Sequence, residues 1–432
     1  MNSSANPRFD VAILGAGPAG IAAAVSAADS GAKVALLDDN PRPGGQIWRG
    51  GPGASQKPEA LRWFERLEKS SVKVFRGARV FHVEHGFLTA ESGDAVLSIE
   101  YKELILATGA REFFLPFPGW TLPNVVGAGG LQALVKSGLP VDGKRVVVAG
   151  TGPLLLAVAT YLRKCGANVL AVCEQTPWSR FARFGLGMSL IPGKLREASK
   201  MLLELGDTPL WTSCWPIAAM GADRLSSVQL SHKGRVREIV CDYLACGFHL
   251  LPNVEIARLA GCRIQGGFVE VNDLQETSVA NVYCAGEPTG IGGLELALVE
   301  GQIAGLAAAH VENAAGKLFG RRATHRRAVR LMKDAFRLRP ELKAVANPDT
   351  LVCRCEDVSL DRLRAFDSWR SAKLQSRCGM GPCQGRVCGA AVQFLFGWEP
   401  DSVRPPVFPV RCSSLAAIAE PEEVSELKGG SR

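Results

Sequence analysis

The sequence predicts an α/β protein with two strand–helix–strand (βαβ) units, followed by a smaller region that is rich in cysteine. In the first unit an apolar strand at 11–14 leads into an alanine-rich helix at 18–30, and a second strand follows at 33–37. The second unit repeats this order, with strands at 145–149 and 168–173 around a helix near 154–164. Five of the 13 cysteines then fall between residues 353 and 388.

The two units are expected to belong to two Rossmann-like dinucleotide-binding domains. An apolar strand at Leu104–Ala107 precedes the second unit and another at Val282–Ala285 follows it, which predicts that the second domain is inserted into the first. We expect the first domain to comprise residues 1–115 and 255–315 and the second to comprise residues 116–254. Residues 316–348 are expected to form a basic linker with a solvated or partner-binding face, and residues 349–432 a small, mainly helical C-terminal domain.

Composition and charge indicate a soluble globular protein. The chain of 432 residues is 47% hydrophobic and 21% charged. Its net charge is +8, and its arginines do not alternate with aromatic residues, so nucleic-acid binding is not expected. Met1–Pro7 has no basic and apolar pattern of an export signal, and the apolar stretch Val146–Leu162 is interrupted by Gly150, Gly152 and Pro153. We therefore expect reduced thiols, a cytoplasmic location and at most peripheral membrane association.

A glycine-rich loop joins the first strand to its helix. In Gly15-Ala16-Gly17-Pro18-Ala19-Gly20, Gly15 allows the tight turn, Gly17 lets a pyrophosphate approach the backbone, and Gly20 lets the helix pack close to the strand. The helix N-terminus adds unpaired N–H groups and a positive dipole end. Asp38 ends the second strand, where a carboxylate can accept hydrogen bonds from a ribose. The loop predicts a dinucleotide site, without separating FAD from NAD.

Three further segments favour FAD by resemblance. All three resemble segments of flavoproteins of the glutathione-reductase type. Gly44-Gly45-Gln46-Ile47 resembles the loop beside the isoalloxazine, Ala285-Gly286-Glu287 the late segment whose carboxylate takes the ribityl chain, and Ala107-Thr108-Gly109 the A-T-G segment. Glu287 stands where those proteins more often have aspartate. No Cys-x₄-Cys redox pair follows the first βαβ unit, so dithiol–disulfide chemistry is not expected.

The second glycine loop departs from the pattern. In Gly150-Thr151-Gly152-Pro153-Leu154-Leu155 a leucine replaces the third glycine, which would push the helix away from the strand or crowd the phosphate site. Glu174 could still meet a ribose. The loop therefore leaves two alternatives, NAD(P)H binding or a retained fold with another ligand or none.

Four cysteines form a candidate metal site. Cys353 and Cys355 are followed after 27 residues by Cys383 and Cys388, in a glycine-rich stretch. Four thiolates suit a [2Fe-2S] cluster, although zinc or unligated thiols remain alternatives. Cys378 is an ambiguous fifth candidate, which we expect to pack beside the ligands and not to bind the metal itself. The others are expected in the core: Cys165, Cys173, Cys214, Cys241, Cys246, Cys262, Cys284 and Cys412.

The chain resembles the α (A) subunits of heteromeric bacterial amine dehydrogenases. That family includes octopine and nopaline oxidases, D-hydroxyproline dehydrogenase, dye-linked L-proline dehydrogenase and the B subunit of hydrogen cyanide synthase. The resemblance rests on Gly15–Gly20, residues 43–47, residues 152–156, residues 352–358 and residues 379–388. It implies FAD, a BFD-like [2Fe-2S] module on Cys353, Cys355, Cys383 and Cys388, and a second loop without its third glycine.

The resemblance also implies a place in a larger enzyme. A glycine-oxidase-like flavoprotein β subunit would hold most of the substrate site, a small ferredoxin-like subunit is a further expected partner, and FMN is expected at a subunit interface. The chain would pass electrons from the oxidised C–N bond of an amino acid, imino acid or opine, such as D-hydroxyproline, to an acceptor. No histidine lies in a recognisable catalytic motif, so no catalytic residue is assigned. Two alternatives remain, a self-contained NAD(P)H-dependent flavin oxidoreductase and a scaffold with a structural nucleotide.

Overall fold

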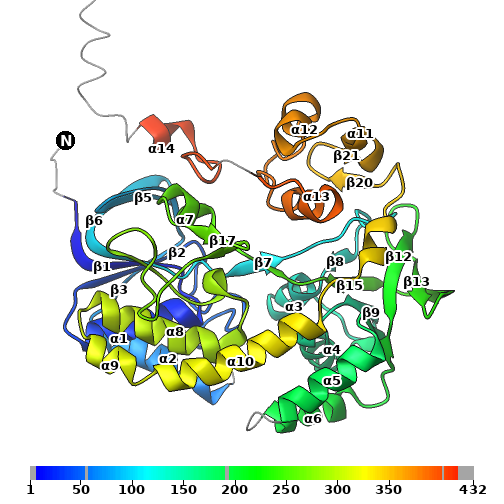
Figure 1. The fold of residues 1–432 in the computed structure, drawn as a ribbon, viewed down its shortest axis with the longest axis horizontal. Coiled ribbons are helices and arrows are strands. Elements are labelled where there is room, and N and C mark those ends of the chain that lie inside the picture. Colours follow the sequence, from blue (N-terminus) through cyan, green and yellow to red (C-terminus); the bar gives the residue numbers. More distant parts are fainter. Residues whose placement is uncertain (1–5, 54–56, 190–193, 401–402, 417–432) are drawn as a thin grey trace, which may run out of the picture. The chain divides into compact units, whose positions relative to one another are not determined.

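The computed structural model describes residues 6–53, 57–189, 194–400 and 403–416 (Figure 1). The chain divides into two compact units. Unit 1 comprises Met1–Gly109, Pro252–Phe319 and Val403–Arg432, and unit 2 comprises Ala110–Leu251 and Gly320–Ser402. Residues 1–5, which carry part of the expectation about an export signal, and residues 417–432 of the expected C-terminal domain lie outside the described residues.

Unit 1 is built on a mixed sheet whose strand order is β3-β2-β1-β6-β5-β4, with β19 also paired to β6. The pairs among β1, β2, β3, β6 and β19 are parallel, as expected for a Rossmann-like domain. The strands are β1 (Arg8–Leu14), β2 (Val34–Asp38), β3 (Lys73–Arg76), β4 (Ala78–Glu84), β5 (Phe87–Ser92), β6 (Ala95–Leu106) and β19 (Val282–Cys284).

Helices α1 (Pro18–Asp29), α2 (Pro58–Lys69) and α8 (Gly293–Ala308) lie along one face of this sheet (Figure 1). α1 and α8 touch through small residues. A Cβ atom added at Gly301 or Gly305 of α8 would lie 2.1 or 2.2 Å from a carbonyl oxygen of α1. Two glycines one turn apart therefore allow the backbones of these helices to meet.

Unit 2 contains a parallel sheet of order β11-β10-β9-β15-β8 and an antiparallel sheet of order β12-β13-β14. Helices α3 (Ala128–Lys136) and α4 (Pro153–Lys164) pack on the parallel sheet through apolar residues such as Leu131 and Val158. The strands are β8 (Val125–Gly127), β9 (Arg145–Gly150), β10 (Asn168–Glu174), β11 (Leu210–Thr212), β12 (Cys214–Met220), β13 (Ser227–His232), β14 (Arg235–Val240) and β15 (Tyr243–Gly247). Both predicted βαβ units are thus present, with element ends shifted by a few residues at most.

The cysteine-rich region belongs to unit 2 and is mainly helical. It starts with the short strands β20 (Leu351–Cys353) and β21 (Val358–Ser359) and continues through α11 (Leu360–Arg364), α12 (Trp369–Ser376) and α13 (Cys388–Phe396). Its buried residues, among them Val352, Leu363 and Trp369, share one apolar cluster with the antiparallel sheet of the same unit. Within unit 2 this region therefore packs on its neighbours.

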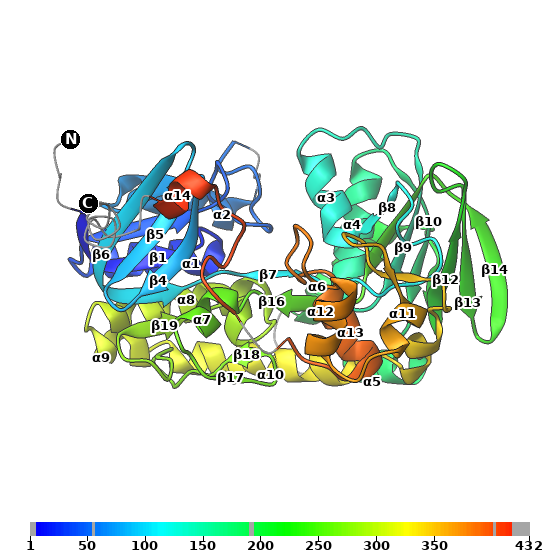
Figure 2. The same cartoon turned by 90° about the horizontal axis from the view of Figure 1, so that it is seen from above.

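The segment expected to be a basic linker is ordered. It includes the long helix α10 (Phe319–Ala335) and the short η2 (Pro340–Ala344), and from Gly320 onward it groups with unit 2. At the other end, Val403–Ala416 groups with unit 1 and ends in α14 (Cys412–Ala416), near β5 (Figure 2). There Arg411 N–H and Ser414 Oγ both donate to Glu91 of β5, at 2.9 and 2.6 Å.

Among the described helices, none has both the length and the apolar character that crossing a bilayer would require.

Candidate cofactor and metal sites

The first glycine loop has the shape that a dinucleotide site needs. A Cβ at Gly20 would lie 1.8 Å from the Gly15 carbonyl oxygen, and one at Gly15 would lie 2.3 Å from that of Ala107. At Gly17, by contrast, an added Cβ would meet only the Gly45 Cα within 4 Å, at 4.0 Å. Two glycines are thus required by packing, while Gly17 leaves space beside its backbone.

Asp38 lies at the end of β2 beside this loop. Its buried carboxylate accepts hydrogen bonds from the Ala16 N–H, at 2.5 Å, and from the Asn40 backbone and side-chain N–H groups, at 2.8 Å. The Ala16 carbonyl oxygen accepts from the Gly44 N–H at 2.7 Å, which fixes the segment containing Gly45 and Gln46 beside the loop. The acid and both loops therefore converge at the carboxyl ends of the parallel strands, where ligands of such sheets bind.

Thr108 and Gly109 follow β6 at the same edge and are held by Asn253. The Asn253 carbonyl oxygen accepts a hydrogen bond from the Thr108 hydroxyl at 2.6 Å, and the Asn253 side-chain amide donates to the Thr108 carbonyl oxygen at 2.9 Å. The Asn253 backbone N–H donates to the Gly109 carbonyl oxygen at 3.0 Å. Asn253 was not identified from the sequence, because it lies far along the chain from the segment that it holds.

Glu287 follows β19 and presents a carboxylate oxygen that has no protein partner among the described residues. Its Oε1 accepts from the Gly293 N–H at 2.9 Å, while Oε2 is buried without a hydrogen bond. Burial raises the pKa of this carboxyl from 4.5 to about 7. Glu300, which was also not identified from the sequence, accepts from the Gly286 N–H at 3.2 Å and the Thr289 hydroxyl at 2.9 Å and so positions the segment. An unsatisfied buried acceptor fits a ligand that donates hydroxyl groups, as the ribityl chain of FAD does.

The second loop differs in conformation from the first. The residue before α4, Gly152, has a φ of +92°, whereas its counterpart Gly17 has a φ of −74°. Leu155 is buried in the apolar cluster beneath α4, so it packs into the core of unit 2. Both oxygens of Glu174 are engaged, because Oε1 accepts from the Thr151 hydroxyl at 2.8 Å and Oε2 from the Gly152 N–H at 2.7 Å. Replacing the third glycine thus coincides with a different loop geometry.

Five thiols converge in the cysteine-rich region. The sulfurs of Cys353, Cys378 and Cys388 are buried and all lie within 4.8 Å of one another. Cys383 is within hydrogen-bonding reach of Cys388 and Cys355, and Cys355 is exposed. The close group thus contains two of the four predicted residues, Cys353 and Cys388, together with Cys378, whose role the sequence pattern left ambiguous. Cys383 contacts this group through Cys388, and Cys355 is reached through Cys383.

The electrostatics of this group favour thiolates at two positions. Hydrogen bonds from Cys378 and Cys388 lower the pKa of Cys353, and a hydrogen bond from Cys388 lowers the pKa of Cys383. The same hydrogen bonds raise the pKa of the donors Cys378 and Cys388. Thiolate is the form that binds metal ions. A cluster of cysteines with these properties fits a metal centre, and thiols alone as donors favour iron–sulfur or zinc chemistry over hard cations.

Glycines allow the chain to close around the thiols. A Cβ at Gly381 would lie 2.4 Å from the Cys355 Cβ, and one at Gly379, whose φ is +82°, would lie 2.7 Å from the Trp369 ring. Backbone N–H groups in such loops can approach sulfur ligands closely. Side chains larger than hydrogen at these two glycines would therefore displace the loop that carries the cysteines.

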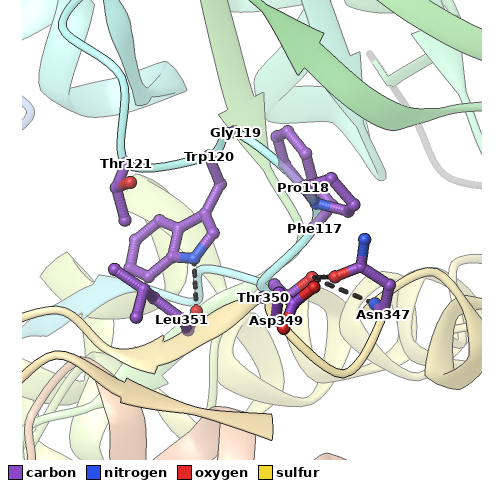
Figure 3. Close-up of a pocket in the computed structure, with 9 residues that line it drawn as sticks. All are labelled: Phe117, Pro118, Gly119, Trp120, Thr121, Asn347, Asp349, Thr350 and Leu351. Atoms are coloured by element: carbon purple, nitrogen blue, oxygen red, sulfur yellow. Dashed lines mark hydrogen bonds between the residues drawn. The ribbon is translucent and has the colours of Figure 1, made fainter.

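A pocket with a volume of about 240 Å³ lies in unit 2 beside the strand that carries Cys353 (Figure 3). The Trp120 Nε1–H donates to the Leu351 carbonyl oxygen at 2.6 Å, which fixes the start of β20. None of the predicted site residues lines this pocket. The lining residues are Phe117, Pro118, Gly119, Trp120, Thr121, Asn347, Asp349, Thr350 and Leu351.

Comparisons with known proteins agree with this geometry. The opine oxidase A chain of Agrobacterium tumefaciens (strain Ach5), one subunit of that enzyme, is 32% identical over 95% of this chain and 92% of its own length. The hydrogen cyanide synthase subunit HcnB of Pseudomonas aeruginosa is 31% identical over 87% of this chain and 90% of its own. The structure of L-proline dehydrogenase from P. horikoshii shares the fold, with a TM-score of 0.64 at 20% identity, over 96% of this chain and 81% of that one.

Residues 9–310 match the family described as pyridine nucleotide-disulphide oxidoreductase. This range contains every residue predicted to bind FAD, and it stops before the cysteine-rich region. Together with the relatives above, the match supports FAD as the cofactor of unit 1 and redox chemistry as the activity. The chain is therefore an FAD-dependent oxidoreductase that belongs to the pyridine nucleotide-disulphide oxidoreductase family.

Proposed function

We propose that this chain is the electron-transferring subunit of a heteromeric dehydrogenase that oxidises the C–N bond of an amino acid, imino acid or opine. The observation that carries the proposal is the convergence of five cysteines in a chain that already belongs to an FAD-dependent family. Two relatives named as enzyme subunits match it over most of their length, which supports a partner subunit.

The cofactors would carry the redox chemistry, FAD exchanging electron pairs and a [2Fe-2S] cluster single electrons. In unit 1, Gly15, Gly17, Pro18, Ala19 and Gly20 would form the pyrophosphate loop. The other proposed FAD contacts are Asp38 at the ribose, Gly286 and Glu287 at the ribityl chain, and Gly45 and Gln46 beside the ring. Ala107, Thr108 and Gly109 complete the proposed contacts.

Cys353, Cys355, Cys383 and Cys388 are the proposed cluster ligands, within a [2Fe-2S] domain at 349–432. A β subunit would supply most of the substrate site, and FMN at the interface and a small ferredoxin-like subunit complete the proposal. The division of the chain into the domains given above, with the second dinucleotide-binding-like domain at 116–254, is part of the same proposal.

The cluster is tested by metal analysis and electron paramagnetic resonance (EPR) of the full chain after anaerobic reconstitution. We expect about two iron atoms and two sulfides per chain and, after reduction, the signal of a [2Fe-2S] centre. Cys383→Ser should lose both. Cys412→Ser changes an exposed thiol of unit 1 and serves as the matched control, which should keep both. A colourless protein that retains zinc would contradict the cluster.

The enzymatic role is tested by expressing the chain alone and together with a glycine-oxidase-like β subunit from the same genome. Octopine, nopaline, D-hydroxyproline, L-proline and glycine cover the substrate classes, and reduction of an artificial dye reports oxidation. We expect activity only when both subunits are present. Oxidation of any of these compounds by the isolated chain would refute the division of labour.

A further inference from the structure

Residues 335–339, here called the plug segment, lie beside the second glycine loop of the same chain. The segment begins at Ala335, the last residue of α10, and belongs, like the loop, to unit 2. Gln175 holds its backbone through two hydrogen bonds: Gln175 Nε2 donates to the Arg337 carbonyl oxygen at 3.2 Å, and the Arg339 N–H donates to Gln175 Oε1 at 3.2 Å. Thr151 Oγ1 and Thr176 Oγ1 each lie 3.5 Å from a carbonyl oxygen of the segment, those of Phe336 and Ala335, but the Thr151 hydroxyl donates its proton to Glu174 Oε1.

These donors and acceptors stand where a dinucleotide-binding domain presents polar groups to its ligand. Thr151 lies between the two glycines of the loop, and Gln175 and Thr176 directly follow β10, the strand whose end meets the ribose in such folds. Gln175 and Thr176 are fully buried. Their hydrogen-bonding capacity is therefore used by the chain itself.

The Phe336 side chain faces Gly152 of the loop. Its ring is 3% exposed and packs edge-on against the rings of Phe184, at 4.9 Å, and Phe181, at 6.3 Å between centroids. A Cβ added at Gly152 would lie 4.0 Å from the Phe336 Cγ. A pyrophosphate would approach the backbone at this glycine. The clearance there equals the 4.0 Å that separates a Cβ at Gly17 from the Gly45 Cα, so the two loops differ in what faces the glycine and not in the distance.

The acidic residue does not distinguish the two loops, because Asp38 and Glu174 both accept hydrogen bonds from their own loop. The difference lies in what faces the central glycine. At Gly17 it is the backbone of another glycine, and at Gly152 it is an aromatic ring packed into a core. A buried ring of this kind is costly to displace, because its apolar surface would be returned to water.

We propose that the plug segment takes the place of a dinucleotide in unit 2 and that Phe336 is the specificity-determining residue that excludes NAD(P)H. The flavin of the chain then receives electrons only from donors that do not need this loop. The inference concerns one unit, and it holds whether or not the cysteines bind a cluster or a partner supplies the substrate.

The test uses the flavin-loaded full chain under anaerobic conditions, with NADH and NADPH as probes. Flavin absorbance reports reduction, and calorimetry with NAD⁺ and NADP⁺ reports binding without chemistry. We expect no reduction and no measurable binding in the wild type, and at least a tenfold gain in affinity in Phe336→Ala. Phe394→Ala is the matched control, because this half-buried ring of the same unit packs against Phe113 and not against the loop. It should bind no nucleotide.

A second variant keeps the test decisive if Phe336→Ala does not fold. Gln175→Ala removes both side-chain hydrogen bonds to the plug segment, and we expect faster hydrogen exchange at the Arg339 amide together with a gain in nucleotide affinity. Rapid reduction of the wild-type flavin by NADH would overturn the proposal. Equal nucleotide affinities in the wild type and in every variant that folds would overturn it as well. Neither result depends on iron content or on the partner subunit, so the proposed function is judged separately.

Discussion

Replacing Glu287 by glutamine should change how the stability of the flavin-free protein depends on pH. The Glu287 residue as a whole is half-buried. Its carboxylate oxygen Oε2, however, is buried and accepts no hydrogen bond from the described residues. Burial raises the pKa of the carboxyl from 4.5 to about 7. Ionising this group in the folded state is therefore unfavourable unless a ligand donates to it.

The sign and size follow from proton linkage. Because the folded pKa is raised, the stabilising contribution of the protonated form is fully present below pH 4.5 and is lost as the pH rises through 7. The shift of roughly 2.5 units corresponds to about 3 kcal/mol at 1.36 kcal/mol per unit. Glutamine has no titration, so the wild type should lose about 3 kcal/mol relative to Glu287→Gln between pH 4.5 and pH 8.

Urea unfolding of both flavin-free proteins at several pH values between 4.5 and 8 measures this difference. The substitution itself changes the free energy of unfolding by an amount that does not depend on pH, because the glutamine amide replaces the carboxylate oxygen Oε2. The slope of the free energy of unfolding with pH is therefore the quantity to compare. Glu68→Gln changes an exposed carboxylate on α2 of the same unit and should leave the slope unchanged. Parallel curves for the wild type and Glu287→Gln would refute the reasoning. Saturation with FAD should flatten the wild-type curve, because ribityl hydroxyls would then donate to the carboxylate.

Three further predictions concern packing. Gly20→Ala should abolish FAD binding and destabilise unit 1 by at least about 1–3 kcal/mol in thermal unfolding, because the new Cβ would lie 1.8 Å from a backbone oxygen. As the control, Gly185→Ala should be neutral or stabilising, because nothing lies within 4 Å of the added Cβ. Leu155→Ala should cost about 2–5 kcal/mol, because this leucine is buried in the core, and gain no NADH binding; a stability equal to wild type would contradict its placement. Trp120→Phe should cost about 0.5–1.5 kcal/mol in urea unfolding for the lost hydrogen bond to Leu351, and a neutral result would show that this bond does not fix β20.

The first loop was predictable because its constraints are local. Gly15 and Gly20 are required by contacts within residues that the βαβ pattern itself brings together, so their spacing predicts both strand and helix. Asn253 and Glu300 could not be found in this way. Each acts on a segment far from it in sequence, and only the completed sheet brings them to that edge.

The cysteine site was predictable in part. The spacing of Cys353, Cys355, Cys383 and Cys388 indicated a group of four. The structure places two of them, Cys353 and Cys388, in one close group with Cys378, and Cys383 and Cys355 follow by pairwise contacts. Cys378 remained ambiguous because its position depends on where α12 ends. That end is marked by Arg377 in a left-handed conformation, which turns the chain so that the next residue, Cys378, is buried beside Cys353. No periodicity in the sequence indicates that turn.

The second loop shows why a departure from a motif is weak evidence until its neighbours are known. Leu155 alone allowed either a helix pushed away from the strand or a crowded phosphate site. In the structure the βαβ fold is retained, the leucine packs into the core, and Gly152 adopts a different φ. What faces Gly152 is Phe336, more than 180 residues further on, which no local pattern could have indicated. The plug segment leads through η2 to the strand that carries Cys353. Polar groups at the position where a dinucleotide-binding fold meets its ligand thus hold, in this chain, the segment that leads into the cysteine-rich region.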